Sequence, residues 1–229
     1  MSAAILVLGS RSPRRCELLS SIVPPERMIV LPPLTPEELC FDDVTTDAAI
    51  ENRLRSIVLR KHADVTARLQ TEPEWAGLRP AGHGYSVADD HVVLVADTIV
   101  VAATTADQRI VLGQPPAANW QYEVRRWLSM LLSGRTHSVL TCFRVTRGSH
   151  SVERIVQTGV TFHELSDAII EWYLAAAESP GKAGGYAIQG RGAALVCGLH
   201  GSLTNVIGLP LIEVADSLRQ LAFWDTPEA

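Results

Sequence analysis

The chain has 229 residues, of which 47% are hydrophobic and 20% are charged, the balance of an ordinary globular protein. This composition excludes an intrinsically disordered chain and a fibrous repeat. The 20 basic and 25 acidic residues give a net charge of −5, opposite in sign to that of most nucleic-acid-binding domains, so we expect no nucleic-acid partner.

Signals for targeting are missing from the sequence, and its cysteines are scattered. No apolar run reaches the roughly 20 residues of a membrane-spanning helix, and the first residues lack the basic-then-apolar order of a secretory signal. Four cysteines without a C-x-x-C pair favour free thiols in a reducing compartment: Cys16, Cys40, Cys142 and Cys197. We therefore predict a cytoplasmic protein without membrane contacts.

Strands and helices alternate in the first part of the chain. The apolar residues 4–8 predict a buried strand, and Ser12–Pro13 supply the N-cap and first-turn proline of a following helix. A short strand is predicted over residues 28–31, and helical spacing of apolar residues predicts a long helix over 47–69. Residues 71–90 are rich in proline, glycine and polar side chains, which predicts a loop insertion.

The rest of the chain continues this mixture. A buried strand over residues 91–96 is expected to end before Asp97, and a hairpin should join 99–102 to 109–112. The later patterns predict a helix over 120–132, a hairpin of strands over 138–146 and 152–162, a helix over 166–177, a strand over 194–198 and a last helix over 211–223. We expect an α/β fold, a mixed twisted sheet flanked by helices, as a single domain over residues 1–229.

Three segments carry residues suited to chemistry. In residues 9–15, G-S-R-S-P-R-R, a strand gives way to a helix start where free N–H groups and two arginines could meet a phosphate. The alternative is a solvated turn whose arginines pair with surface acids. Asp97 follows a buried strand, where a carboxylate could hold Mg²⁺ or accept a proton from an attacking water; the alternative is an aspartate that caps a turn.

The third segment is the glycine-rich stretch 181–192, G-K-A-G-G-Y-A-I-Q-G-R-G. Glycines let a backbone approach a ligand closely, and the amide of Gln189 could read the edge of a base. The stretch fits neither a dinucleotide-binding fingerprint nor a Walker A loop. The alternative is a glycine-rich surface loop.

Five motifs in one order give the chain a resemblance to the Maf family of nucleoside triphosphate pyrophosphatases. They are S-R-S-P-R-R-C-E-L-L at residues 10–19, V-A-D-T-I-V at 95–100, L-S-G-R-T-H-S-V at 132–139, K-A-G-G-Y-A-I-Q-G at 182–190 and N-V-I-G-L-P at 205–210. The resemblance implies two lobes around a nucleotide-binding cleft. It also implies hydrolysis of a nucleoside triphosphate to the monophosphate and diphosphate, aided by Mg²⁺ or Mn²⁺.

The resemblance also implies roles for single residues. Asp97 matches the family's proton acceptor, and Arg14, Thr98 and Gln189 match its specificity positions, in the form that looks like the dTTP/UTP branch. A metal site needs a second carboxylate beside Asp97, for which we expect Glu38, with Glu37 as the other candidate. The residues expected to face or bind the substrate are Ser12, Arg14, Arg15, Lys61, Thr98, Lys182 and Gln189. A homodimer is implied by family habit.

One departure from the family pattern leaves alternatives open. Gln114 stands between Gly113 and Pro115 where the family has a lysine, and glutamine cannot neutralise phosphate charge. One alternative is therefore a non-catalytic Maf-like nucleotide-binding regulator of cell division. Another is the same enzyme with a different triphosphate preference, such as 7-methyl-GTP.

Overall fold

A mixed β-sheet forms the centre of the molecule. The computed structural model describes residues 4–34, 39–71 and 91–224, and in these ranges seven strands form one sheet in the order β2-β1-β3-β5-β6-β7, with β4 paired to β3. The strands are β1 (Ile5–Gly9), β2 (Met28–Val30), β3 (His91–Ala103), β4 (Arg109–Leu112), β5 (Thr136–Arg147), β6 (His150–Phe162) and β7 (Val196–His200). The α-helices are α1 (Pro13–Ser20), α2 (Asp47–Thr71), α3 (Trp120–Trp127), α4 (Asp167–Leu174), α5 (Leu203–Ile207) and α6 (Leu211–Gln220).

Strand β3 is the element around which the site is built. Its first half, His91–Val95, pairs in parallel with β1, and its last residues, Val100–Ala103, pair antiparallel with β4 on the same edge. The other edge pairs antiparallel with β5 from Val92 to Val101. Within the described residues, Ala96–Ile99 therefore have no strand partner on the β1/β4 edge, and this gap in the ladder leaves room for a cleft.

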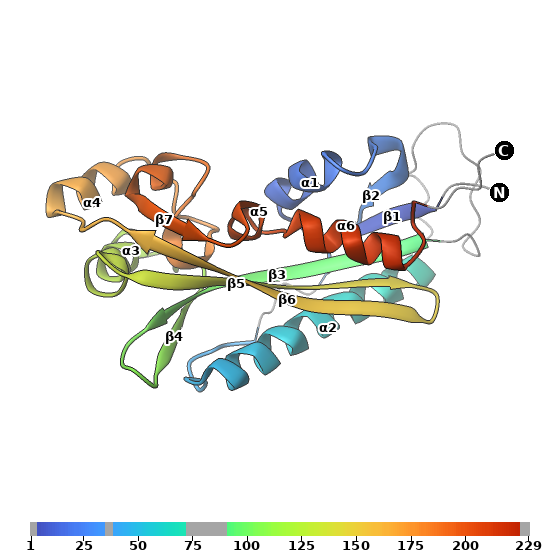
Figure 1. Ribbon diagram of the computed structural model, residues 1–229, viewed down its shortest axis with the longest axis horizontal. Coiled ribbons are helices and arrows are strands. Elements are labelled where there is room, and N and C mark those ends of the chain that lie inside the picture. The colour runs from blue at the N-terminus through green and yellow to red at the C-terminus, as the bar shows by residue number, and fades with distance from the viewer. Residues whose placement is uncertain (1–3, 35–38, 72–90, 225–229) are drawn as a thin grey trace.

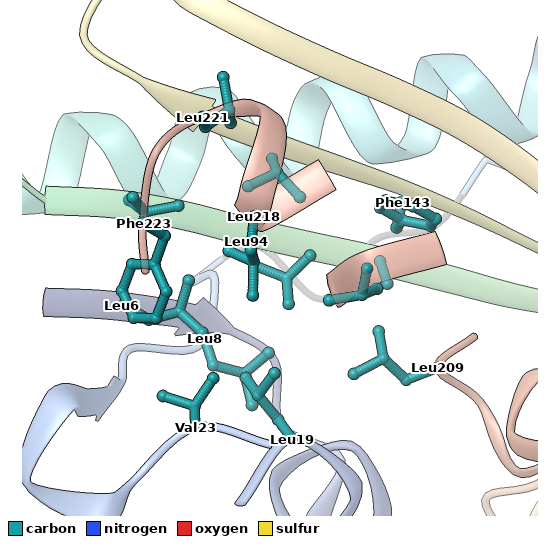
Figure 2. Packing of buried hydrophobic residues seen from close by; sticks show 14 of the residues in the cluster. Leu6, Leu8, Leu19, Val23, Leu94, Phe143, Leu209, Leu218, Leu221 and Phe223 are labelled. Carbon is teal, nitrogen blue, oxygen red and sulfur yellow. The ribbon is translucent and has the colours of Figure 1, made fainter. Parts of the chain in front are cut away.

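Helices cover both faces of the first half of the sheet. α1 and α6 lie on one face and α2 lies on the other (Figure 1). Because side chains alternate along a strand, Leu94 of β3 packs towards α1 and α6, whereas Val95 packs towards α2. Figure 2 shows the first of these cores, where Leu19 and Leu218 close over the strands. Burying each such leucine contributes about 2 kcal/mol.

A third core lies at the other end of the long strands. It packs α3 and α4 against β3, β5 and β6, and its buried members include Val100, Trp127, Phe162, Tyr173 and Tyr186. The predicted α/β class, with helices flanking a mixed twisted sheet, is confirmed.

Several predicted boundaries are wrong, each for an identifiable reason. The strand predicted to stop before Asp97 runs on to Ala103, because the ladder with β5 continues through Asp97 and outweighs the low strand preference of aspartate. The last strand begins at Val196, after a 3₁₀ turn over Arg191–Leu195. The short helix α5 was not predicted; Ser202 caps it by accepting a hydrogen bond from the backbone N–H of Asn205.

Other expectations are confirmed or lie outside the described part. Ser12 and Ser166 cap α1 and α4 as predicted, and the four cysteines are free thiols. The proposed insertion at residues 71–90 falls, except for its first residue, outside the described residues. In the part of the chain that is described, no helix combines the length and the apolar character that a membrane span requires.

Candidate active site

A cleft of about 1060 Å³ opens beside the unpaired edge of β3. It lies between the two halves of the sheet, as the two-lobe expectation requires. Its walls come from the β1–α1 turn, α2, β3, the turn after β4, the glycine-rich segment and α5. Of the residues singled out in the sequence it brings together Ser12, Arg14, Arg15, Lys61, Asp97, Thr98, Lys182 and Gln189, while Glu37 and Glu38 lie outside the described residues.

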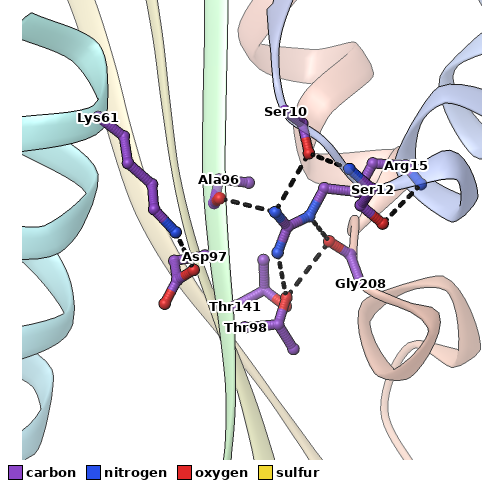
Figure 3. Close-up of polar contacts among 9 residues, drawn as sticks. All are labelled: Ser10, Ser12, Arg15, Lys61, Ala96, Asp97, Thr98, Thr141 and Gly208. Carbon is purple, nitrogen blue, oxygen red and sulfur yellow. Dashed lines mark hydrogen bonds and ion pairs between the residues drawn. The ribbon is translucent and has the colours of Figure 1, made fainter. Parts of the chain in front are cut away.

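Asp97 and Lys61 form a charged pair on the α2 side of β3. Lys61 Nζ donates to Asp97 Oδ1 at 2.5 Å, and the two side chains are only 16% and 8% exposed (Figure 3). Asp97 lies within a strand and not, as the sequence had predicted, after one, so pairing with β5 fixes its backbone.

Cys142 is the residue of β5 that pairs with Asp97. Burial raises the pKa of the Cys142 thiol to about 12, so this thiol stays protonated and is no nucleophile.

Arg15 lies on the opposite side of β3, where Thr98 points. Its Nη1 donates to Ala96 O at 2.8 Å, its Nη2 to Thr98 Oγ1 at 2.9 Å and its Nε to Gly208 O at 2.8 Å (Figure 3). One guanidinium thus links α1, β3 and the residue after α5, and we call Arg15 a clamp for this reason. Thr98 Oγ1 is also 2.9 Å from the hydroxyl of Thr141 on β5. The sequence predicted that Arg15 would bind phosphate. In the structure its guanidinium nitrogens donate to oxygen atoms of the protein.

Arg14, the preceding residue, has a different environment. Its side chain lines the cleft and makes no hydrogen bond or ion pair with the residues described around it. Burial lowers the pKa of Arg14. Successive helix residues point about 100° apart, which is why adjacent arginines reach such different surroundings. Arg14 is the cation at the start of α1 that is available to an anionic ligand.

The segment 181–192, called the glycine loop from here on, forms the facing wall. Lys182 Nζ donates to the backbone carbonyl of Glu178 at 2.5 Å. Burial lowers the pKa of Lys182, and the positive charge of Arg14 lowers it further. The two cations are therefore close enough to act on one polyanion. Gln189 is exposed and lines the same cleft.

Buried side chains hold the glycine loop in place of strand pairing. The Tyr173 hydroxyl donates to Gly185 O and accepts from the N–H of Ala187, each at 3.2 Å. The Tyr186 hydroxyl lies 2.8 Å from His137 Nε2. Gly184 has φ +71°, and a Cβ there would lie 2.7 Å from Val100, so a glycine is required.

Sequence reasoning missed the residues that support the site. Tyr173, Thr141 and Glu178 contact residues of the site or the glycine loop, yet all three lie outside the quoted motifs. His137 and Tyr186 did fall within quoted motifs, but nothing in the sequence showed that they touch. Only the packing of the third core brings them together.

The cleft offers a carboxylate that suits a divalent cation. Mg²⁺ usually keeps several waters and binds through one or two carboxylates together with substrate phosphates. Asp97 supplies one carboxylate at the cleft wall. Within residues 4–34, 39–71 and 91–224, no three His, Cys, Asp or Glu side chains gather as a potential metal site. With Asp97 as the carboxylate at the cleft wall, a metal here would take its other ligands from waters and from the phosphates of a ligand.

A buried carboxylate, a lysine beside it and two further cations in one cleft define an α/β protein suited to a polyphosphate ligand. The chain belongs to the Maf-like protein family, whose model matches residues 5–221. It is 37% identical to a dTTP/UTP pyrophosphatase of Granulibacter bethesdensis over 97% of this chain and 95% of the relative. Proteins of the same name from Shewanella oneidensis (37% identical, 94% and 97% covered) and Pyrococcus furiosus (35% identical, 91% of each) are also similar.

Proposed function

We propose that this protein hydrolyses nucleoside triphosphates, with dTTP and UTP preferred, to the nucleoside monophosphate and diphosphate. The observation that carries the proposal is the cleft in which Asp97 and Lys61 face the same space as Arg14 and Lys182. Membership of the Maf-like family and relatives named dTTP/UTP pyrophosphatases support the choice of reaction and substrate.

The proposed reaction is attack by water on the α-phosphorus. A bond forms between the water oxygen and the α-phosphorus, the bond from that phosphorus to the bridging oxygen breaks, and diphosphate leaves. Asp97 accepts the proton that the water loses, and Lys61 holds the carboxylate in place. Arg14 and Lys182 stabilise the negative charge that builds up on the phosphates.

A divalent cation, Mg²⁺ or Mn²⁺, is part of the proposal. Asp97 and the substrate phosphates would hold it, with Glu38 as the proposed second carboxylate. When bound, such a cation neutralises phosphate charge and lowers the pKa of a coordinated water. Removal of divalent cations with a chelator should abolish turnover, and added Mg²⁺ or Mn²⁺ should restore it.

We assign base selection to Gln189 and a supporting role to Ser12 and Arg15. The amide of Gln189 can donate to and accept from the imide edge of uracil or thymine. Ser12 caps α1 through its hydroxyl, and Arg15 holds Thr98 at the cleft wall. The homodimer and the cytoplasmic location stay predictions; sedimentation of the purified protein tests the first, and fractionation of cells tests the second.

The test is a panel of nucleoside triphosphates with the purified protein, Mg²⁺ or Mn²⁺, and identification of both products. We expect UTP and dTTP to yield the monophosphate and diphosphate in equal amounts, faster than CTP, ATP, GTP or 7-methyl-GTP. Release of inorganic phosphate as the first product would contradict the assigned bond. Binding of UTP without turnover would favour the nucleotide-binding regulator.

A further inference from the structure

Glu178, just after α4, contacts the glycine loop near both of its ends. Its backbone carbonyl accepts from Lys182 Nζ at 2.5 Å, and its carboxylate Oε1 accepts from the backbone N–H of Arg191 at 3.0 Å. The residue also lines the cleft. One residue thus connects the proposed phosphate-binding lysine to the backbone two residues after Gln189.

The packing against Gly190 shows how closely the carboxylate and the loop fit. A Cβ on Gly190 would lie 2.4 to 2.6 Å from the three carboxylate atoms of Glu178, closer than any real Cβ contact. Gly190 has φ −123° and ψ −145°, so its φ is not in the left-handed region but its backbone is neither helical nor regularly extended. The Glu178 carboxylate therefore occupies the space beside Gly190, and a side chain at position 190 would displace it.

The other carboxylate oxygen makes this contact costly. Glu178 Oε2 is buried and has no hydrogen-bond partner in the part of the chain that the structure describes. A buried polar atom without a partner costs stability, and one of the explanations for such an atom is a functional role.

Glu178 supports the part of the loop that the tyrosine anchor does not reach. Tyr173 fixes Gly185 and Ala187 through its hydroxyl. Beyond Ala187, a turn joins the Gly190 N–H to the Ala187 carbonyl, and Glu178 then holds Arg191. Gln189 lies inside this turn, and because its side chain is exposed, the backbone decides where its amide points.

We propose that Glu178 is a positioning residue for base selection: it fixes the Gly190–Arg191 backbone and so sets the direction in which Gln189 meets the base. Through its carbonyl it also sets the distance between Lys182 and Gln189, and thus between the phosphates and the base that the cleft accepts. This inference rests on the proposed function and names a residue that acts on its specificity.

The test compares Glu178→Ala with Glu178→Gln, because glutamine keeps the acceptor for the Arg191 N–H and removes only the charge. We expect Glu178→Ala to lower the preference for UTP over GTP, measured as the ratio of kcat/KM, about tenfold, mainly by raising KM for UTP. Glu178→Gln should restore the ratio to within about threefold of wild type. An Ala variant with an unchanged ratio, or a folded Gln variant that fails to restore it, would overturn the proposal.

Gly190→Ala supplies an independent test of the same contact. The added methyl group must displace the carboxylate, so this variant should lose the UTP preference to a similar extent. The double variant Glu178→Ala/Gly190→Ala should be no worse than Glu178→Ala alone, because the methyl group then has room. Losses that multiply in the double variant would mean that the two residues act separately, against the proposal.

Two controls separate this proposal from the function itself. Circular dichroism and thermal unfolding show which variants fold; if Glu178→Ala does not, Glu178→Asp takes its place, since its shorter side chain cannot reach Arg191. If the wild type turns over no triphosphate, the proposed function fails, and the Glu178 proposal is then tested by the affinities for non-hydrolysable UTP and GTP analogues. An unchanged ratio of affinities in the folded variant would overturn it there too.

Discussion

The two walls of the cleft hold their side chains in different ways. Asp97 and Thr98 lie in the middle of β3, where the ladder to β5 fixes the backbone whatever the side chain is; we call them the strand-held part. Lys182 and Gln189 lie in the glycine loop, whose backbone is fixed by hydrogen bonds from side chains; they are the loop-held part. We infer a division of work between one residue of each part: Asp97 of the strand-held part serves the reaction step, which is common to all substrates, and Gln189 of the loop-held part selects the nucleotide.

The largest effect is expected at the strand-held part. Asp97→Asn keeps the size of the side chain but removes the charge to which we assign proton acceptance and metal binding. We predict a fall in kcat of at least about a hundredfold with every nucleotide that the wild type hydrolyses. Steady-state kinetics of the purified variant provide the measurement, and activity near that of the wild type would contradict the role of Asp97.

The adjacent arginines should differ in their effect on stability. Arg15→Lys leaves the carbonyls of Ala96 and Gly208 without the fork that satisfies both, so we expect a loss of about 2 to 4 kcal/mol in the free energy of unfolding. Arg14→Lys is the matched control and should change stability by less than about 0.5 kcal/mol while raising KM. Urea unfolding compares the two; equal losses would refute the assignment of Arg15 as a clamp.

The support beneath the glycine loop should be sensitive to acid. Burial lowers the pKa of His137 from 6.5 to about 4. The unfolded chain therefore takes up a proton at a pH where the folded protein does not, and the stability that neutral His137 provides is lost as the pH falls below about 6.5. We predict that this residue accounts for about 2 kcal/mol of the stability lost between pH 7 and pH 5. In His137→Gln the loss over this interval should be smaller by that amount; identical pH profiles would contradict the prediction.

A change at the loop-held part should alter the choice of substrate. Gln189→Glu removes the amide donor and adds a negative charge near the phosphates. We predict that kcat/KM for dTTP and UTP falls roughly tenfold or more relative to the other nucleotides. If the order of preference across the panel stays the same, Gln189 does not read the base.

The smallest effect is expected at the turn after β4. Gln114 is exposed and lines the cleft, so Gln114→Lys would place an ammonium group near the phosphates. We predict a two- to fivefold gain in activity that shrinks as salt is added, about the effect of a partly exposed charge. Arg109 does not compensate for the missing lysine, because it pairs with Asp47 away from the cleft. A fall in activity at both low and moderate salt would mean that another cation already serves this position.

The sequence predicted what depends on neighbouring residues. The cap at Ser12, the apolar strands and the glycine loop follow from local patterns. The motifs also identified most of the residues that the structure places around the cleft. The clamp of Arg15 could not be predicted, since its acceptors Ala96 and Gly208 lie 81 and 193 residues away along the chain. Likewise, the continuation of β3 through Asp97 depends on pairing with a strand about 45 residues later, which no local preference records.

The division between the two parts of the cleft is tested most directly by one comparison of kcat/KM for UTP and GTP in the wild type, Asp97→Asn and Gln189→Glu. We predict that Asp97→Asn lowers both values by the same factor and leaves their ratio unchanged, whereas Gln189→Glu changes the ratio about tenfold. A changed ratio in Asp97→Asn, together with an equal loss on both nucleotides in Gln189→Glu, would contradict the division.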